Sequence, residues 1–219
     1  MTKRGAAGSI VLASESPRRR DLLAALGVSF STHPPQIDES SGEPCPGRRA
    51  VELALAKARA VDGLVPGALV LGADTIVVAP DAAPLGKPPD AESARAMLHA
   101  LRGRVHRVVT GVAAIRGERS GTECVSTRVR MRSYSRAEIE RYLARGEPFD
   151  KAGGYAIQDR EFAPAAETEG CLCSVIGLPL WSARRLLAAI GGIASEPPAL
   201  ESCFSCPLRD GPAAAAGVR

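Results

Sequence analysis

Apolar residues occur in short runs separated by glycine, proline and charged residues, which is typical of alternating strands and helices. Ile10–Ala13 and residues 68–71 have the composition of short buried strands. Helical spacing of apolar residues is found in 17–26, 47–61 and 90–102, and a glycine stands shortly after each of these segments. The first half of the chain therefore predicts an α/β domain.

The second half of the chain begins with two longer segments of strand character. Residues 105–115 and 124–133 predict a hairpin, and 171–176 predicts a further buried strand. The capping box 135–138 marks the start of one helix, and the last helix is expected over 179–190. The whole pattern predicts a mixed twisted sheet with flanking helices.

Positive charge is concentrated where the first helix begins. Ser16 has the character of an N-cap, Pro17 suits the first helical position, and arginines occupy 18–20. A helix N-terminus carries unpaired N–H groups and a partial positive charge, so added arginines favour an anion such as phosphate there. The alternative is an ordinary amphipathic helix whose first-turn arginines point into water. This stretch alone does not separate the two interpretations.

Asp74 interrupts an otherwise apolar stretch. The run 68–71 stops at Gly72, and apolar residues resume over 76–79. A carboxylate inside such a stretch is costly unless it has partners, which makes Asp74 a candidate site residue. A strand-end aspartate that binds local amides is the less favoured alternative, because further polar motifs flank this one.

The composition is that of a globular protein with room for a substantial core. The chain has 219 residues, 45% of them hydrophobic and 24% charged, with a net charge of +4. No apolar run approaches the length of a membrane span, and residues 1–8 lack the apolar core of a secretion signal. Residues 192–219 are rich in alanine, proline and glycine. We therefore expect one domain over 1–191 followed by a mostly disordered tail.

The six cysteines are scattered, which favours reduced thiols over a disulfide framework. Cys203 and Cys206 have the spacing of half a zinc site, but no second pair with matching spacing is found. A redox pair and a chance pair in the tail are the alternatives, and the chance pair is the simplest interpretation. The chain also has three histidines and no His/Cys cluster, so the sequence does not predict a zinc site.

Lysine is rare, and most of the lysines lie among other candidate polar residues. The chain has four lysines among its 28 basic residues. The candidate residues are Ser14, Arg18, Arg19, Glu39, Lys57, Asp74, Thr75, Lys87, Lys151 and Gln158. Cations around carboxylates suit a polyanion that is held together with a hard divalent ion. A glycine-rich P-loop and a Gly-x-Ser-x-Gly elbow are both missing, which disfavours a P-loop enzyme and acyl transfer.

Short motifs in a fixed order resemble those of the Maf family of nucleoside triphosphate pyrophosphatases over about residues 9–190. The motifs are Leu12–Arg19, Asp38–Glu39, Lys57–Ala60, Gly72–Thr75, Gly86–Pro88, Gly103–His106 with Thr110, Asp150–Gln158 and Gly177–Leu180. Each motif alone is weak, whereas the full set in the family's order is specific.

The resemblance implies the mixed α/β fold of the family, similar to inosine triphosphate pyrophosphatases, with two lobes around a cleft. It implies a cytoplasmic, often dimeric enzyme that uses a divalent cation, Mg²⁺ or Mn²⁺, to split a nucleoside triphosphate into the monophosphate and pyrophosphate. Asp74 matches the proton acceptor of the family and, with Glu39, is an expected metal ligand. The residues that match positions around the phosphates and the metal are Ser14, Arg19, Glu39, Lys57 and Lys87.

Three positions carry the substrate preference that the resemblance implies. Arg18, Thr75 and Gln158 together resemble the subfamily that acts on dTTP and UTP, whereas the 7-methyl-GTP subfamily has tryptophan at the position of Arg18. A Maf-type enzyme with a different base specificity is one alternative. A nucleotide-binding regulator of septum formation is another, and the full set of catalytic candidates argues against a purely binding role.

Two segments depart from the pattern of the family. After Gln158 the family usually continues with glycine, but Asp159 stands here and opens the polar segment 159–169. We expect this segment to lie near the nucleotide, where it bears on the breadth of substrates. The tail from about Gly192 extends beyond the family core.

A row of arginines lies on the second strand of the predicted hairpin. Arg128, Arg130 and Arg132 alternate with apolar residues, and no aromatic side chain interleaves them. A solvated sheet face is therefore favoured over a surface that binds nucleic acid. The expected partners are a nucleoside triphosphate and a second copy of the chain, with neither nucleic acid nor membrane.

Overall fold

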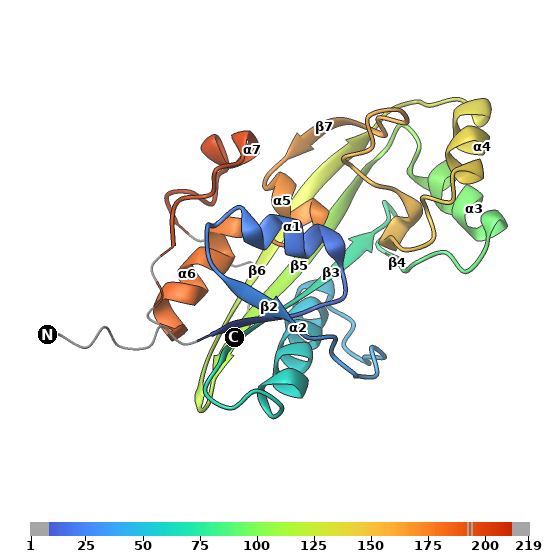
Figure 1. Ribbon diagram of the computed structural model, residues 1–219. Helices are drawn as coiled ribbons and strands as arrows, with labels where there is room; N and C mark the ends of the chain where they lie inside the picture. The colour runs from blue at the N-terminus through green and yellow to red at the C-terminus, as the bar shows by residue number, and fades with distance from the viewer. Residues whose placement is uncertain (1–8, 192, 194, 212–219) are drawn as a thin grey trace, which may run out of the picture.

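A seven-stranded sheet organises the residues that the computed structural model describes, which are 9–191, 193 and 195–211 (Figure 1). The elements in chain order are β1 Ile10–Ala13, α1 Pro17–Ala24, β2 Phe30–Thr32, α2 Pro46–Asp62, β3 Leu69–Val78, β4 Pro84–Leu85, α3 Ala91–Leu101, β5 Val105–Arg116, β6 Arg119–Met131, α4 Arg136–Ala144, the 3₁₀ turn η1 Ala152–Gly154, β7 Ala165–Glu169, α5 Leu172–Ile176, α6 Leu180–Gly191 and α7 Glu201–Phe204. The predicted mixed sheet with flanking helices is confirmed.

The strands combine parallel and antiparallel pairing. Their order across the sheet is β2, β1, β3, β5, β6 and β7, and β4 also pairs with β3. β1 is parallel to β2 and β3, whereas the remaining pairs are antiparallel. The helices begin as predicted, because the side chains of Ser16, Asp90 and Ser135 each accept a hydrogen bond from a backbone N–H in the first turn. Among the described helices, none has the length and hydrophobicity to cross a bilayer.

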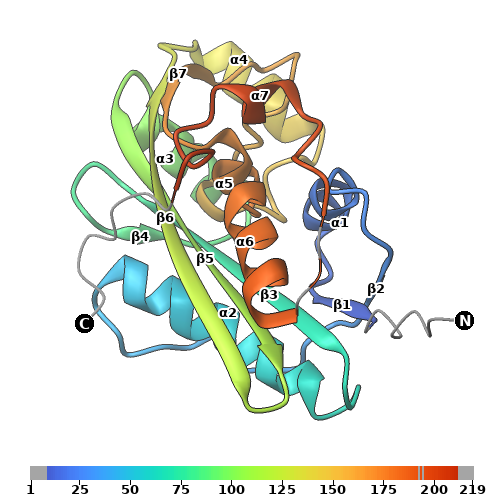
Figure 2. The same cartoon turned by 90° about the vertical axis from the view of Figure 1, so that its left-hand side faces the viewer.

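Helices cover both faces of the sheet. α2 lies on one face, and α5 and α6 lie on the other (Figure 2). β3 serves both sides, since Leu69 and Leu71 pack with the α6 side and Val70 packs with the α2 side. Two glycines allow α2 to lie directly on the sheet backbone. A Cβ atom at Gly72 or Gly111 would stand 2.3 Å from a backbone oxygen of α2.

A second, smaller lobe shares the far end of the same sheet. α3 and α4 pack there around an aromatic group in which Phe162 stacks on Tyr142, 4.3 Å between ring centroids, and contacts Tyr134. This core is separate from the cluster between the sheet and α6. The sheet therefore connects two lobes, as the resemblance implied.

Two parts of the chain differ from the prediction. The segment 171–176 was predicted as a strand but contains the short helix α5, Leu172–Ile176, and β7 was not predicted at all. A short apolar run does not distinguish a buried strand from one turn of buried helix. β7 is the polar segment AAETE, whose strand state depends on pairing with β6. Tertiary contacts decided both elements.

The tail also differs from the prediction over 195–211. The sequence predicts a mostly disordered segment, but α7 packs against α5, and Cys203, Cys206 and Leu208 are buried in the core beside α6. Hydrogen bonds fix it as well, for example from Arg185 to the carbonyl oxygen of Leu208, at 2.8 Å. The composition of the tail did not predict this packing. A few buried side chains are enough to dock so short a segment, and they hardly change its overall composition. The rest of the predicted tail, residues 212–219, lies outside the described residues. So does residue 192, where the tail was predicted to begin.

Candidate active site

The site opens where one edge of β3 has no neighbouring strand among the described residues. β1 pairs with β3 at residues 69–72, and β4 pairs with it at 77–78. Within the described chain, residues 73–76 therefore present a free strand edge on this side. β1 ends at the same point, which delivers Ser14 and the start of α1 to the gap. A cavity of about 680 Å³ fills the space between the two lobes.

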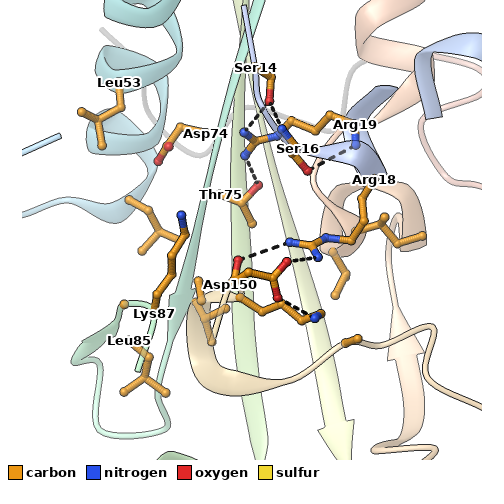
Figure 3. Close-up of a pocket in the computed structure, with 18 of the residues that line it drawn as sticks. Ser14, Ser16, Arg18, Arg19, Leu53, Asp74, Thr75, Leu85, Lys87 and Asp150 are labelled. Atoms are coloured by element: carbon orange, nitrogen blue, oxygen red, sulfur yellow. Dashed lines mark hydrogen bonds and ion pairs between the residues drawn. The ribbon is translucent and has the colours of Figure 1, made fainter. Parts of the chain in front are cut away.

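All of the residues that the family resemblance implicated line this one cavity. They are Ser14, Arg18, Arg19, Glu39, Lys57, Asp74, Thr75, Lys87 and Gln158. They come from β1, α1, α2, β3 and the loops around them, and Figure 3 shows several of them projecting into the common space. The fold thus brings together residues that are up to 144 positions apart in the sequence, from Ser14 to Gln158.

A buried lysine joins two carboxylates at the base of the cavity. Lys57 Nζ lies 2.6 Å from Asp74 Oδ1 and 2.8 Å from Glu39 Oε1. The side chains of Lys57 and Asp74 are 7% and 10% exposed, whereas that of Glu39 is 59% exposed. Side chains alternate along β3, so Asp74 points to the face that carries α2 and meets Lys57 there. The partners that Asp74 required are therefore present, as expected.

Arg19 is held from three other segments of the chain. Its guanidinium donates to Gly177 O at 3.0 Å, to Thr75 Oγ1 at 3.3 Å and to Ser14 Oγ at 3.4 Å. Thr75 also shares a hydrogen bond of 3.0 Å with Thr110. Because these bonds fix the plane of the guanidinium, Arg19 offers an oriented fork to an anion in the cavity.

Arg18 belongs to a different part of the rim. It forms an ion pair with Asp150, 2.8 Å between Nη1 and Oδ2, and Lys151 Nζ lies 2.6 Å from the other oxygen of Asp150 (Figure 3). Arg18 and Asp150 keep 28% and 58% of their side chains exposed. The two neighbouring arginines thus have separate environments, one inside the cavity and one at its mouth.

Two cavity residues of α2 escaped the sequence analysis. Leu53 and Arg49 line the cavity one and two turns before Lys57, respectively, on the same face of the helix. Among the described residues, the buried Nε of Arg49 has no hydrogen-bond partner. The spacing of four residues to Leu53 and eight to Lys57 was the signal that could have found Arg49.

The electrostatics of the cavity favour an anionic ligand. Cationic side chains outnumber carboxylates among the lining residues. The hydrogen bond from Lys57 holds the pKa of Glu39 below its usual range, so Glu39 is ionised at neutral pH. Burial lowers the pKa of Arg19, which Asp74 partly opposes, and the guanidinium stays charged. A polyphosphate would meet an excess of fixed positive charge here.

The donor set also fits a hard divalent cation. Glu39 and Asp74 converge on the same lysine nitrogen, so their oxygens lie close together. Carboxylate oxygens are the ligands that Mg²⁺ prefers, and one or two of them suffice when phosphate oxygens and water complete the shell. Among the described residues, Lys57 is the one donor to Asp74 and engages Oδ1, so Oδ2 accepts no hydrogen bond from the described chain.

The segment after Gln158 does not lie where the sequence analysis expected it. Gln158 lines the cavity, but residues 159–169 do not. Asp159 forms an ion pair with Arg145 and accepts the backbone N–H groups of Glu161 and Phe162. The carboxylate turns away from the cavity because the capping of this turn satisfies it.

Comparison with known proteins identifies the family of the chain. The family model described as Maf-like protein matches residues 9–190. The chain belongs to the Maf family. Among its relatives, the dTTP/UTP pyrophosphatase of Thermomicrobium roseum is 49% identical over 205 residues, which cover 91% of this chain and 94% of the relative. The dTTP/UTP pyrophosphatase of Moorella thermoacetica is 49% identical over 185 residues, 83% of this chain and 95% of the relative.

Comparison with solved structures gives partial matches only. The Ham1 protein of Staphylococcus aureus aligns with 57% of this chain and 72% of its own, at 12% identity and a TM-score of 0.44. This similarity is too partial to bear on the chemistry of the site. The Maf assignment rests instead on the family match and on the relatives.

Proposed function

We propose that this protein hydrolyses dTTP and UTP to the monophosphate and pyrophosphate. The observation that carries the proposal is the cavity in which Lys57 joins Asp74 and Glu39 beside the fixed fork of Arg19. The relatives that cover most of the chain are named dTTP/UTP pyrophosphatases. Phosphoanhydride hydrolysis needs a base, fixed positive charge and an oriented substrate, and this cavity contains residues for each task.

Asp74 is suited to act as the base. A water molecule attacks the α-phosphorus, its proton passes to Asp74, and the bond from the α-phosphorus to the bridging oxygen breaks to release pyrophosphate. Oδ2 is the oxygen available to accept the proton, because Lys57 engages Oδ1. Lys57 orients the carboxylate of Asp74 through their hydrogen bond of 2.6 Å. The remaining cations, Arg19 and Lys87, compensate the charge that develops on the phosphate oxygens.

Asp74 and Glu39 would hold a divalent cation, Mg²⁺ or Mn²⁺. When bound, such an ion supplies positive charge to the phosphate oxygens and lowers the pKa of a coordinated water. We expect chelation to abolish hydrolysis and added Mg²⁺ to restore it. Full activity of a chelator-treated enzyme would contradict this assignment.

Residues at the rim of the cavity are expected to select the nucleobase of the substrate. Arg18 stands at the mouth in its pair with Asp150, and Gln158 lines the cavity from the neighbouring segment. An amide presents both a donor and an acceptor, which suits the edge of a pyrimidine base. Thr75 accepts a hydrogen bond from Arg19 and lines the cavity. It therefore contributes to base selection by orienting Arg19 and by shaping the cavity wall.

A screen of nucleoside triphosphates with separate detection of pyrophosphate and orthophosphate tests the proposal. The full-length protein with Mg²⁺ or Mn²⁺ is expected to release pyrophosphate from dTTP and UTP faster than from purine nucleotides. Release of orthophosphate, or equal rates on ATP and GTP, would contradict it. The homodimeric state and the cytoplasmic location stay predictions, and light scattering of the purified protein tests the first of these.

A further inference from the structure

Four of the six cysteines gather on the side of the sheet away from α2. Cys171 and Cys173 come from the start of α5, and Cys203 and Cys206 come from α7 and the turn after it. All four are buried free thiols in one core cluster. The sulfurs of Cys173 and Cys203 are 3.5 Å apart, and Cys171 and Cys206 are buried beside them in the same cluster. We call these four residues the thiol cluster.

The segment that brings two of these thiols has few buried side chains. α7 is four residues long, its N-cap makes no side-chain hydrogen bond, and Phe204 within it is 59% exposed. Helices this short are not stable by themselves. Cys203, Cys206 and Leu208 are the buried hydrophobic side chains of the described tail after Leu200. A metal bound by cysteines of both α5 and the α7 segment would stabilise the docking of α7 on the core.

We propose that the thiol cluster is a structural zinc site with four cysteine ligands. Two closely spaced pairs, Cys-x-Cys and Cys-x₂-Cys, approach each other from separate segments, and thiolates suit Zn²⁺. Zn–S bonds of about 2.3 Å place tetrahedral sulfurs about 3.8 Å apart, close to the observed 3.5 Å. In the described chain, no three ligand side chains already surround a metal position. Binding must therefore rearrange the four sulfurs around the metal by side-chain rotation, with release of the thiol protons.

Hydrogen bonds already hold the backbone around the thiol cluster. The indole nitrogen of Trp181 donates to Cys203 O at 3.1 Å, and the hydroxyl of Ser174 donates to Cys171 O at 2.7 Å. Supports of this kind keep ligand-bearing segments in place around a metal. Trp181 is also the one tryptophan of the chain, so its fluorescence reports directly on this region.

The helix α5 connects the proposed zinc site to the active site. Ser174 O, next to Cys173, accepts the hydroxyl of Thr110 at 2.7 Å, and Gly177 O, at the end of α5, accepts Arg19 Nε at 3.0 Å. Zinc at the start of α5 therefore stabilises the helix that positions the fork of Arg19. Loss of zinc is expected to weaken nucleotide binding as a secondary effect.

Zinc content measures the site without reference to hydrolysis. The full-length protein is purified with reductant, saturated with zinc and dialysed to remove weakly held ions, and zinc is then counted. We expect about one zinc per chain in the wild type, in Asp74→Asn and in the control Cys45→Ser/Cys124→Ser, and almost none in Cys173→Ser/Cys203→Ser. The Asp74→Asn protein excludes zinc held at the active site.

Wild-type protein alone gives two further measurements, so the proposal does not depend on whether a variant folds. Cobalt in place of zinc is expected to show thiolate-to-cobalt charge-transfer absorption, and a strong chelator is expected to change the fluorescence of Trp181. A zinc-free wild type, zinc retained by Cys173→Ser/Cys203→Ser, or disulfides within the cluster would overturn the proposal. These results are independent of which nucleotide the enzyme hydrolyses.

Discussion

Two groups of charged residues in this protein form ion pairs of similar length but lie in different surroundings. In the cavity, Lys57 lies between Asp74 and Glu39 with 7% of its side chain exposed. On the outer strands, Arg128 pairs with Glu169 at 2.9 Å and Arg130 pairs with Glu167 at 3.1 Å, with more than half of each side chain exposed. The ion pairs of both groups are short, and the two groups differ in how far their side chains are exposed to solvent.

The comparison shows that burial, more than the number of ion pairs, determines what a charge does. Exposed pairs gain little because water already solvates both partners. A buried group has lost that solvation, so each member depends strongly on the others and is available for chemistry. The arginine row of β6 is thus a solvated, neutralised sheet face, which agrees with the simpler of its two interpretations. The prediction that it does not bind nucleic acid stays a prediction.

The largest effect is expected when the cavity group loses its base. Asp74→Asn keeps the shape of the side chain but cannot accept a proton in the same way, so turnover of dTTP should fall about 100- to 10,000-fold. Asp81→Asn is the matched control, because Asp81 lies in an exposed turn outside the cavity. Steady-state release of pyrophosphate measures both variants, and a turnover within a few-fold of the wild type would reject Asp74 as the base.

Removal of the buried Lys57 cation tests how much this group contributes to the stability of the protein. Lys57→Met leaves Asp74 without its partner, and we expect a loss of about 2–3 kcal/mol in the free energy of unfolding, somewhat below that of a fully dry pair because the cavity admits water. Arg59→Met on the exposed side of α2 should cost much less. Denaturant unfolding compares the two, and equal losses would show that burial is not the deciding factor.

His106 extends the comparison to a buried group without a counter-charge. It is 2% exposed, hydrogen-bonds Tyr155 at 2.7 Å, and burial lowers its pKa from 6.5 to about 4. As the pH falls from 6.5 towards 4 the unfolded chain takes up this proton first, so the contribution of His106 is complete above pH 6.5 and is lost below it. Between pH 7 and pH 5 the loss should be about 2 kcal/mol.

His106→Gln should remove this part of the pH dependence, whereas the exposed His99→Gln should leave it unchanged. Denaturant unfolding at several pH values measures the slope. The same slope in His106→Gln and the wild type would assign the pH dependence to other groups.

The smallest effect is expected on the outer strands. Arg130→Ala should change the free energy of unfolding by about 1 kcal/mol or less, an effect that added salt reduces, and should leave turnover unchanged. A double-mutant cycle with Glu167→Ala isolates the energy of the pair. A coupling above about 2 kcal/mol would remove the contrast between the exposed and the buried group.

The sequence by itself determined the local features of this protein. The N-caps Ser16, Asp90 and Ser135, the amphipathic helices and the hairpin follow from side-chain hydrogen bonding and periodicity within a few residues. It also marked Asp74 as a carboxylate in need of partners, because the cost of its burial is visible in the neighbouring residues. The ordered motifs then named the family.

Tertiary structure decided which residues meet. The sequence did not show that the edge of β3 is free at 73–76, since that gap depends on where two distant strands stop. The helical spacing to Lys57 could have pointed to Arg49, but only the structure shows that Arg49 lines the cavity. The sequence also left Cys203 and Cys206 as half a site, because their counterparts lie 30 residues away in a segment that reads as a strand. Contacts across such separations depend on packing, which no local pattern encodes.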